Sequence, residues 1–320
     1  MITRLKGILF AVVLGLICPV IIIGFVKRNV NAPDTTKPED TTEKQAVKQD
    51  SVSIDVLQDD GSVTAMDIND YLTCVVLGEM PAAFEDEALK AQAVVARTYT
   101  LRRLTKGGKH IDAAVCTNSD CCQGYYDLAS YLDNGGKQED IDKVKTAVKM
   151  TDDLVLTYGG ELIDATYFSC SGGMTEDASA VWGADVPYLR SVESPGEESA
   201  EHYVDTVSFK TSEFLQLLEL DAKKNVKIGK ITYTPGGGVD TIQVCNEEFR
   251  GTQLRKILGL RSTAFVISVV GDTVTITTKG FGHRVGMSQY GADAMAVSGA
   301  TFPEILAHYY QGVQLITYDN

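Results

Sequence analysis

The sequence predicts an α+β fold, in which helices and antiparallel hairpins are mixed within one domain. Three observations favour this class. Pairs of apolar segments are separated by short turns that contain glycine, as in antiparallel hairpins. One segment near residue 90 is apolar on nearly every side, as expected of a buried helix. Strands and helices also follow one another without the regular alternation that a doubly wound parallel sheet requires.

The first 28 residues predict a membrane anchor. Residues 7–26 contain no charged side chain, and a segment of this length can cross a bilayer as one helix. No small-x-small cleavage site follows, so we expect a retained anchor and not a cleaved signal peptide. Two basic residues precede the span and two follow it, so the charge pattern alone does not set its orientation.

Residues 29–51 predict a flexible linker, because they are mostly Asn, Asp, Thr, Lys, Pro and Glu. Residues 52–320 then form the folded part, as one domain with room for two lobes. The chain has a net charge of −14, and its acidic surface would repel a phosphate backbone. The sequence therefore argues against general nucleic-acid binding, whereas a neutral sugar chain is compatible with this charge.

The folded part begins with a predicted hairpin and a helix. Val52–Leu57 and Val63–Ile68 flank a short turn, which indicates two antiparallel strands. Asn69 and Asp70 can cap the helix that follows. This helix is expected to end at Glu79.

A longer helix is predicted from about Glu85 to Leu104, and Gly107-Gly108 provides its C-terminal signal. Acidic residues in its first turn suit the helix dipole. The later elements are expected to be an irregular Cys-rich loop at 112–133, a helix at 141–150, a hairpin at 154–158 and 161–168, a helix at 211–220, a turn at 236–238, a helix at 252–258, a hairpin at 264–270 and 273–278, helices at 287–297 and 302–310, and a strand near 313–317.

Glu79 is the candidate for acid–base chemistry. It lies at a helix end, directly before a Met-Pro break, and apolar residues surround it in the sequence. We expect Val75, Val76, Met80 and Phe84 to wall its site. Apolar walls disfavour a charged carboxylate, so they suit a general acid that works near neutral pH.

Three polar residues interrupt the apolar helix behind Glu79. Lys90 and Arg97 are seven residues apart and so share one helix face, and Gln92 lies between them in the sequence. Polar groups on a buried helix need partners, so these residues could hold Glu79 or a polar ligand. They could equally make structural pairs or extend to the surface.

A second constellation consists of His110, Cys116, Cys121 and Cys122. Imidazole and thiolate ligands this close in the sequence suit zinc, although their spacing matches none of the common finger patterns. A Cys116–Cys122 disulfide and free thiols are the alternatives. A thiol-based hydrolase that uses Cys116 or Cys122 with His110 is a weaker possibility, because no residue is evident that would orient the histidine.

A serine- and glycine-rich segment follows the predicted hairpin at 154–168. Ser169, Ser171, Trp182 and Tyr188 are candidates for stacking on a sugar or hydrogen-bonding to it. Trp182 could instead pack in the core.

The sequence GFGHRVGMSQYGA, from residue 280 to residue 292, is the third constellation. His283 lies between glycines before a predicted helix start, and a Gly-rich turn of this kind presents free backbone N–H groups. Such groups suit a carbonyl oxygen, for example that of an N-acetyl group. With Ser288, Gln289 and Tyr290 beside it, this segment is expected to form a cleft wall.

Together, four ordered segments resemble the SpoIID/LytB family. They are GEMPAAFEDEALKAQAVVARTY from Gly78 onward, the Cys-rich loop Cys116–Tyr125, the segment Ser169–Glu197 and the segment Gly280–Ala296. The resemblance extends from about residue 53 to the C-terminus.

The resemblance implies a peptidoglycan lytic transglycosylase with Glu79 as the catalytic acid. It also implies that Lys90, Gln92 and Arg97 matter for activity. Such an enzyme needs only one carboxyl group, which protonates the glycosidic oxygen and then helps the muramyl 6-hydroxyl to close on the anomeric carbon. Most glycosidases need two.

The resemblance further implies a structural zinc ion in the Cys-rich loop. Cys116 and Cys122 would be ligands, His110 would be the next, and Cys121 would replace a histidine that is usual in the family. Arg284 also departs from the family pattern, since a glycine is common after the histidine that corresponds to His283. We expect this exchange to alter the rim of the site but not to remove the site.

The family's biology implies a protein anchored by one helix, with its N-terminus inside and its catalytic domain outside the cytoplasm. It would act in endospore formation, during engulfment, from the mother-cell membrane that faces the septal wall. It would cut glycan strands that have lost their stem peptides, together with a partner amidase and other membrane proteins of the engulfment machinery. A non-catalytic wall-binding or amidase-enhancing subunit is the alternative, because some relatives in the wider family act as amidase enhancers.

Overall fold

The computed structural model describes residues 52–201 and 203–319. The chain divides into two units, Met1–Gln49 and Asp50–Asn320, and the second contains all of the described residues. The predicted anchor at 1–28 and the predicted linker at 29–51 lie outside the described residues. Within the described part of the chain, no helix has the length and apolar character needed to cross a membrane.

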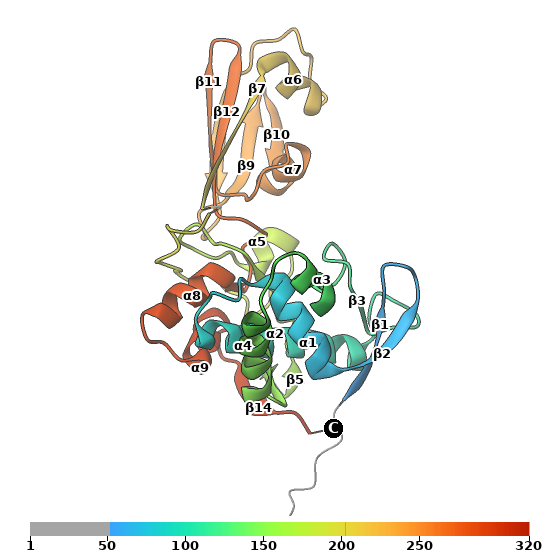
Figure 1. Cartoon of the computed structure of the whole chain (residues 1–320). Coiled ribbons are helices and arrows are strands. Elements are labelled where there is room, and N and C mark those ends of the chain that lie inside the picture. Colours follow the sequence, from blue (N-terminus) through green and yellow to red (C-terminus); the bar gives the residue numbers. More distant parts are fainter. Residues whose placement is uncertain (1–51, 202, 320) are drawn as a thin grey trace, which may run out of the picture. The chain divides into compact units, whose positions relative to one another are not determined.

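The described residues form helices and short sheets, which confirms the α+β class (Figure 1). The helices are α1 (Ile68–Glu79), α2 (Asp86–Lys106), α3 (Leu128–Asp133), α4 (Gln138–Met150), α5 (Ala178–Trp182), α6 (Thr211–Leu217), α7 (Gly251–Ile257), α8 (Gln289–Val297) and α9 (Phe302–Tyr309). The strands are β1 (Ser53–Leu57), β2 (Val63–Asp67), β3 (Val115–Cys116), β4 (Leu154–Tyr158), β5 (Glu161–Leu162), β6 (Tyr167–Phe168), β7 (Val204–Lys210), β8 (Ile228–Tyr233), β9 (Val239–Val244), β10 (Glu247–Arg250), β11 (Phe265–Val270), β12 (Thr273–Lys279), β13 (Met287–Ser288) and β14 (Gln314–Thr317).

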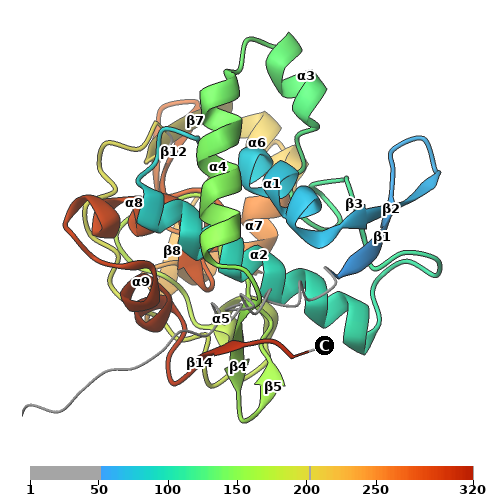
Figure 2. The same ribbon diagram turned by 60° about the horizontal axis from the view of Figure 1, so that its bottom comes forward.

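The first hydrophobic core surrounds α2. This helix contacts α1, α4, α8, α9 and the strand β4, so it is covered on several sides (Figure 2). Its sequence explains this position, because alanine and valine dominate its middle and leave almost no polar face. The close packing of α1 against α2 fixes the end of α1, where Glu79 lies.

A second hydrophobic core lies in a β-rich region. Here the sheet β11-β12-β7 and the sheet β10-β9-β8 are both antiparallel, and α6 and α7 pack with them. The hairpin β11–β12 was predicted, and so were α6 and α7 within a few residues. The strands β7, β8, β9 and β10 were not predicted.

A buried ion pair joins this β-rich region to the first one. The Arg284 guanidinium lies 3.3 Å from Glu176 Oε1, and both side chains are almost fully buried. Arg284 also donates to the backbone carbonyls of Ser171, Met174 and Gly236, each at 2.7 Å. Because Gly236 lies in the turn between β8 and β9, this arginine ties the two regions together.

The backbone of Arg284 has φ = 67°, a left-handed conformation that favours glycine. This geometry gives a physical reason for the glycine that the family pattern places there. The expectation that Arg284 would alter the rim of the site is wrong in its location, because the side chain turns into the interior.

Other differences from the predicted elements are local. Asp67 caps α1, accepting from the N–H groups of Asn69 and Asp70, whereas these two had been expected to be the caps. The predicted second strand at 161–168 is interrupted: β5 ends at Leu162, and β6 leaves the hairpin to pair in parallel with β13. The irregular loop at 112–133 contains the short strand β3 and ends in the helix α3.

Candidate active site

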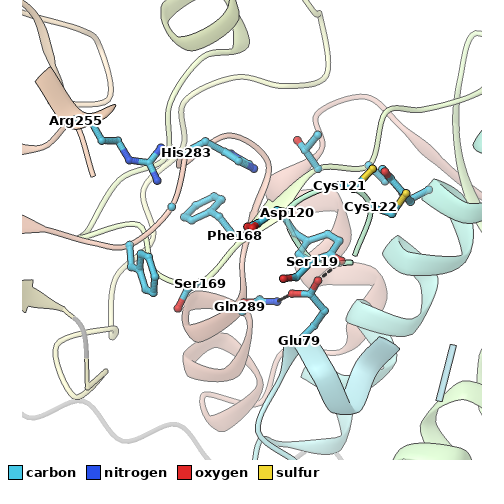
Figure 3. Close-up of a pocket in the computed structure, with 16 residues that line it drawn as sticks. Glu79, Ser119, Asp120, Cys121, Cys122, Phe168, Ser169, Arg255, His283 and Gln289 are labelled. Carbon is cyan, nitrogen blue, oxygen red and sulfur yellow. Dashed lines mark hydrogen bonds between the residues drawn. The ribbon is translucent and has the colours of Figure 1, made fainter. Parts of the chain in front are cut away.

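A cavity of about 710 Å³ opens beside the end of α1. Its lining combines Glu79 with aromatic, hydroxyl and sulfur-bearing side chains (Figure 3). The residues that line it are Glu79, Tyr99, Ser119, Asp120, Cys121, Cys122, Ala165, Thr166, Tyr167, Phe168, Ser169, Arg255, Phe281, Gly282, His283 and Gln289. Typical small-molecule sites measure about 300–1,000 Å³, and the cavity falls in the upper part of this range. It is large enough for more than one sugar ring.

Three donors from three distant segments hold the Glu79 carboxylate. The backbone N–H of Gly124 donates to Oε1, and the Tyr167 hydroxyl lies 2.8 Å from the same oxygen. Gln289 Nε2 donates to Oε2 at 3.2 Å. The pairing of β6 with β13 brings Tyr167 and Gln289 together, because it aligns Tyr167 with Met287. The arrangement orients the carboxylate with neutral groups only.

Glycine is needed where the Cys-rich loop meets the end of α1. A Cβ at Gly78 would come within 2.7 Å of the backbone nitrogen of Tyr125. A Cβ at Gly124 would lie 3.1 Å from the Glu79 carboxyl carbon and 3.0 Å from the Gly78 carbonyl oxygen. The two glycines therefore let backbone approach backbone, which is the contact that places the Gly124 N–H on Glu79.

Tyr167 remains a hydrogen-bond donor at any physiological pH. Burial, followed by the neighbouring Glu79, raises the pKa of this phenol well above its usual value. Its hydroxyl also lies 3.2 Å from Gln123 Oε1, and Gln123 in turn donates to Thr100 Oγ1 at 3.1 Å. This buried chain fixes the position of the phenol.

The surroundings of Glu79 differ from the expected apolar walls. Val75, Val76, Met80 and Phe84 are buried in the first core, and none of these four residues lines the cavity. Val75 and Val76 lie in α1, which packs against α2 and α4, and Phe84 packs edge-on against Tyr290. The carboxylate itself lies among hydrogen-bond donors.

The predicted metal ligands come together in the structure. Ligand atoms of His110, Cys116, Cys121 and Cys122 all lie within 4.8 Å of one another. His110 Nε2 is 3.6 Å from the sulfur of Cys121 and 3.5 Å from that of Cys122. The cysteines are free, so the arrangement is one of four ligands around a point and not a disulfide. The group can hold a metal ion.

This metal cluster adjoins the cavity. Cys121 and Cys122 line it, and the chain runs directly from Cys122 through Gln123 to Gly124. The loop that the cluster would organise is therefore the loop that supplies the backbone donor to Glu79.

The serine-rich segment contributes Ser169 to the cavity lining. Tyr167, two residues earlier, lies on the same face of this extended segment and also lines the cavity. The structure places Ser171 and Tyr188 outside the cavity lining. Ser171 is fully buried, and its hydroxyl donates to Glu197 Oε2 at 2.9 Å. The Tyr188 hydroxyl accepts from the backbone N–H of Asp164 at 2.9 Å. Both side chains support the segment from behind the cavity.

Trp182 is 46% exposed, so it is not a core residue. Its ring centroid lies 5.2 Å from that of His283, which lines the cavity. The indole therefore lies next to the cavity, where it can stack on a sugar ring.

In the segment 280–292, His283 and Gln289 line the cavity. Ser288 instead caps α8, accepting from the Gly291 N–H, and Tyr290 packs edge-on against Phe84. The Tyr290 N–H donates to the Ser169 carbonyl. The expectation of free N–H groups at this helix start is thus wrong for residues 290 and 291, because the fold itself uses them.

The three polar residues of α2 lie outside the cavity lining. Lys90 Nζ pairs with Glu87 at 2.6 Å. Arg97 is buried and donates to the carbonyls of Val148 and Thr151, so it caps the C-terminal end of α4. Gln92 is fully buried, and its amide has no hydrogen-bond partner among the described residues. Any effect of these residues on Glu79 must act through helix packing.

Sequence reasoning did not find Gly124, Tyr167 or Arg255. Tyr167 was detectable, because alternate residues of a strand share a face and Ser169 was already a candidate. Gly124 acts through its backbone, which leaves little side-chain signal. Arg255 lies on α7 in the β-rich region, and in the sequence it falls between the predicted motifs that end at Glu197 and begin at Gly280.

Comparisons with known proteins identify the family of this chain. A family model described as "Stage II sporulation protein" matches residues 58–158, which include Glu79 and the Cys-rich loop. The chain belongs to the SpoIID family of sporulation proteins.

Individual relatives extend the match beyond this segment. Stage II sporulation protein D of Bacillus subtilis (strain 168) is 36% identical over 96% of this chain and 95% of its own. The protein of the same name from Bacillus amyloliquefaciens is 38% identical over 86% of this chain and 81% of its own. A B. subtilis protein named "Amidase enhancer" is 31% identical over 76% of this chain but only 40% of its own length.

Proposed function

We propose that this chain is a peptidoglycan lytic transglycosylase that cuts the MurNAc–GlcNAc bond of denuded glycan strands. The observation that carries this proposal is the Glu79 carboxyl group, which is held by three neutral donors at the edge of an open cavity. These hydrogen bonds orient the carboxyl group, and no cation among the described residues is paired with it. Both features suit acid–base chemistry.

In the proposed reaction, protonated Glu79 gives its proton to the glycosidic oxygen as the bond to the anomeric carbon breaks. The carboxylate then accepts the proton of the muramyl 6-hydroxyl, whose oxygen bonds to that carbon. The products are a 1,6-anhydro-MurNAc end and a free 4-hydroxyl, and no water is consumed. Tyr167, Gln289 and the Gly124 N–H keep the carboxyl group in place during both steps.

Zinc fits the cluster of His110, Cys116, Cys121 and Cys122. A tetrahedral zinc ion separates its nitrogen and sulfur ligands by roughly 3.5 Å, given Zn–S and Zn–N bonds of about 2.3 and 2.0 Å. The two sulfur–nitrogen distances in the cluster, 3.6 and 3.5 Å, agree with this value. Four protein ligands would leave no open position, so the ion would stabilise the loop and take no part in the reaction.

We also propose that residues 7–26 anchor the protein in the membrane and that the catalytic domain lies outside the cytoplasm. The linker would let the domain reach the septal wall from the mother-cell membrane during engulfment. A partner amidase would remove stem peptides and so prepare the substrate. The sporulation family and the relative named "Amidase enhancer" support the link to sporulation and to an amidase.

The decisive experiment is digestion of denuded glycan, followed by mass spectrometry of the ends. We expect anhydromuramyl ends from the wild type and a loss on the order of 10³-fold in rate for Glu79→Gln. Asp120→Asn, which alters the other carboxylate of the cavity lining, is the matched control and should keep most of the activity. Reducing ends, or identical digestion by the wild type and Glu79→Gln, would exclude the transglycosylase.

The metal is tested by elemental analysis of the purified chain. We expect one zinc ion per chain and its loss in Cys116→Ser. A Cys116–Cys122 disulfide in a zinc-free protein would overturn the assignment.

A non-catalytic, amidase-enhancing subunit is the second candidate, and the relative of that name favours it. In that case Glu79→Gln would stimulate a purified sporulation amidase as well as the wild type does, and neither would produce anhydro ends.

A further inference from the structure

Arg255 brings a positive charge into the cavity from the β-rich region. The other charged groups of the lining are Glu79 and Asp120, both acidic. Burial lowers the pKa of His283 to about 4, with nearby Arg255 as a further cause, so this imidazole is neutral at physiological pH. Figure 3 shows Arg255 across the cavity from Glu79, with Phe168 and His283 between them.

No carboxylate among residues 52–201 and 203–319 forms an ion pair with the Arg255 guanidinium. Its Nε donates to the Leu260 carbonyl at 3.3 Å, which fixes the plane of the group. Burial lowers its pKa, and no described carboxylate offsets that effect. Other arginines of this part of the chain are paired: Arg261 lies 3.4 Å from Asp205, and Arg284 lies 3.3 Å from Glu176.

A partly buried cation without a partner is costly, unless a ligand supplies the anion. The two terminal nitrogens of a guanidinium can bind a carboxylate in a bidentate manner. Along a glycan strand, GlcNAc is neutral. MurNAc carries a lactyl group, which is a neutral amide when a stem peptide is attached and a carboxylate when the peptide has been removed.

We propose that Arg255 binds the free lactyl carboxylate of a muramyl residue and so selects glycan without stem peptides. This inference rests on the proposed function, because it concerns the same cavity. The lactyl carboxylate that Arg255 binds belongs to the part of the glycan strand that lies away from Glu79, beyond Phe168 and His283 (Figure 3).

The test measures binding and needs no turnover. The full-length chain, in detergent and with Glu79→Gln, is titrated with denuded strands and with the same strands after conversion of their lactyl carboxylates to carboxamides. We expect the carboxamide strands to bind about 10- to 100-fold more weakly, as for the loss of a charge-assisted pair. Adding Arg255→Gln should weaken binding of the carboxylate strands by a similar factor and change binding of the carboxamide strands less than about twofold.

Lys256→Gln is the matched control, because it removes the same charge from the next, exposed residue of α7. It should leave both affinities unchanged. Arg255→Lys should recover part of the discrimination, since it restores the charge without the bidentate geometry. Strands that retain their stem peptides should bind like the carboxamide strands, because the peptide's own carboxylates lie elsewhere.

Equal binding of the two strands by the Glu79→Gln chain would overturn the inference even if Arg255→Gln failed to fold. Arg255-dependent binding of peptide-bearing strands, equal losses for Lys256→Gln, or no binding of either strand would also overturn it. If the affinities follow the expected pattern but the wild type leaves no anhydro ends, the proposed reaction fails while the carboxylate site stands.

Discussion

Glu79 and Glu176 are two carboxylates held inside the same fold in opposite ways. Glu79 receives only neutral donors and faces a cavity. Glu176 is fully buried against Arg284, and it also accepts from the Gly238 N–H at 3.0 Å. The first arrangement orients a carboxyl group without cancelling its charge, whereas the second neutralises it and joins two regions. Of these two carboxylates, only the one without a paired cation faces a cavity.

The largest effect should come from breaking the Arg284–Glu176 pair. Arg284→Met leaves Glu176 buried without its cation, so we expect the free energy of unfolding to fall by about 4 kcal/mol. Equilibrium denaturation measures this value. The double variant Arg284→Met, Glu176→Gln should recover part of the loss, because no charge then remains buried. A single variant as stable as the wild type would contradict the structural role.

The comparison can be inverted by placing a cation beside Glu79. In Gln289→Lys the ammonium group would pair with the carboxylate, hold it ionised and remove the proton that the acid step needs. We expect the rate of anhydro-end formation to fall on the order of 100-fold. Gln289→Met removes the donor without adding charge and should cost less. Equal losses for the two variants would show that charge is not the deciding difference.

Much of the helical region could be predicted from the sequence. The bounds of α1 and α2 agree with the expectation to within a few residues, because caps, glycines and a continuous apolar run mark them. The group of four candidate metal ligands was also predicted, since these residues lie close in sequence. By contrast, β7 alternates between exposed and partly buried residues, but its partly buried positions are Asp205, Val207 and Phe209. Because one of these is charged, the sequence shows no continuous apolar alternation there.

The candidate site was only partly predictable, because only some of its groups lie in local sequence motifs. Glu79, Ser169, His283 and Gln289 lie in local motifs and do line the cavity. The backbone donor of Gly124 depends on the approach of two loops, which no local pattern encodes.

A smaller effect on the reaction rate is expected from adding a methyl group beside Glu79 at one of its neutral donors, Gly124. Gly124→Ala places a methyl group against Glu79 and the Gly78 carbonyl, so the carboxylate must shift. We expect about a tenfold lower rate, as for a modest misplacement of a catalytic group, with little change in stability. Gly229→Ala, at an exposed strand position, places a methyl group 3.0 Å from the Gln243 Cβ but outside the cavity lining, so it is the control and should be fully active. An unaltered rate for Gly124→Ala would mean that this close approach does not position Glu79.

The smallest effect concerns His283, which lies between the cavity and the Arg284 pair. Its pKa in the folded protein is about 4, below the value of 6.5 for a free histidine. The unfolded chain therefore binds a proton first as the pH falls, so stability is full above about pH 6.5 and declines toward pH 4. Since the ring is only partly buried, we expect this decline to be about 1 kcal/mol. Thermal denaturation of His283→Asn should show a flatter slope over that range, and an identical slope would exclude the effect.

The donors to Glu79 are spread over most of the chain, and Gln289 comes 210 residues after it. A polypeptide that stops during synthesis or export before residue 289 therefore cannot complete the constellation, even with its helices α1 and α2 already made. For the wall-cutting activity proposed above, late completion would be a safeguard, because an unfinished copy would lack a donor to Glu79.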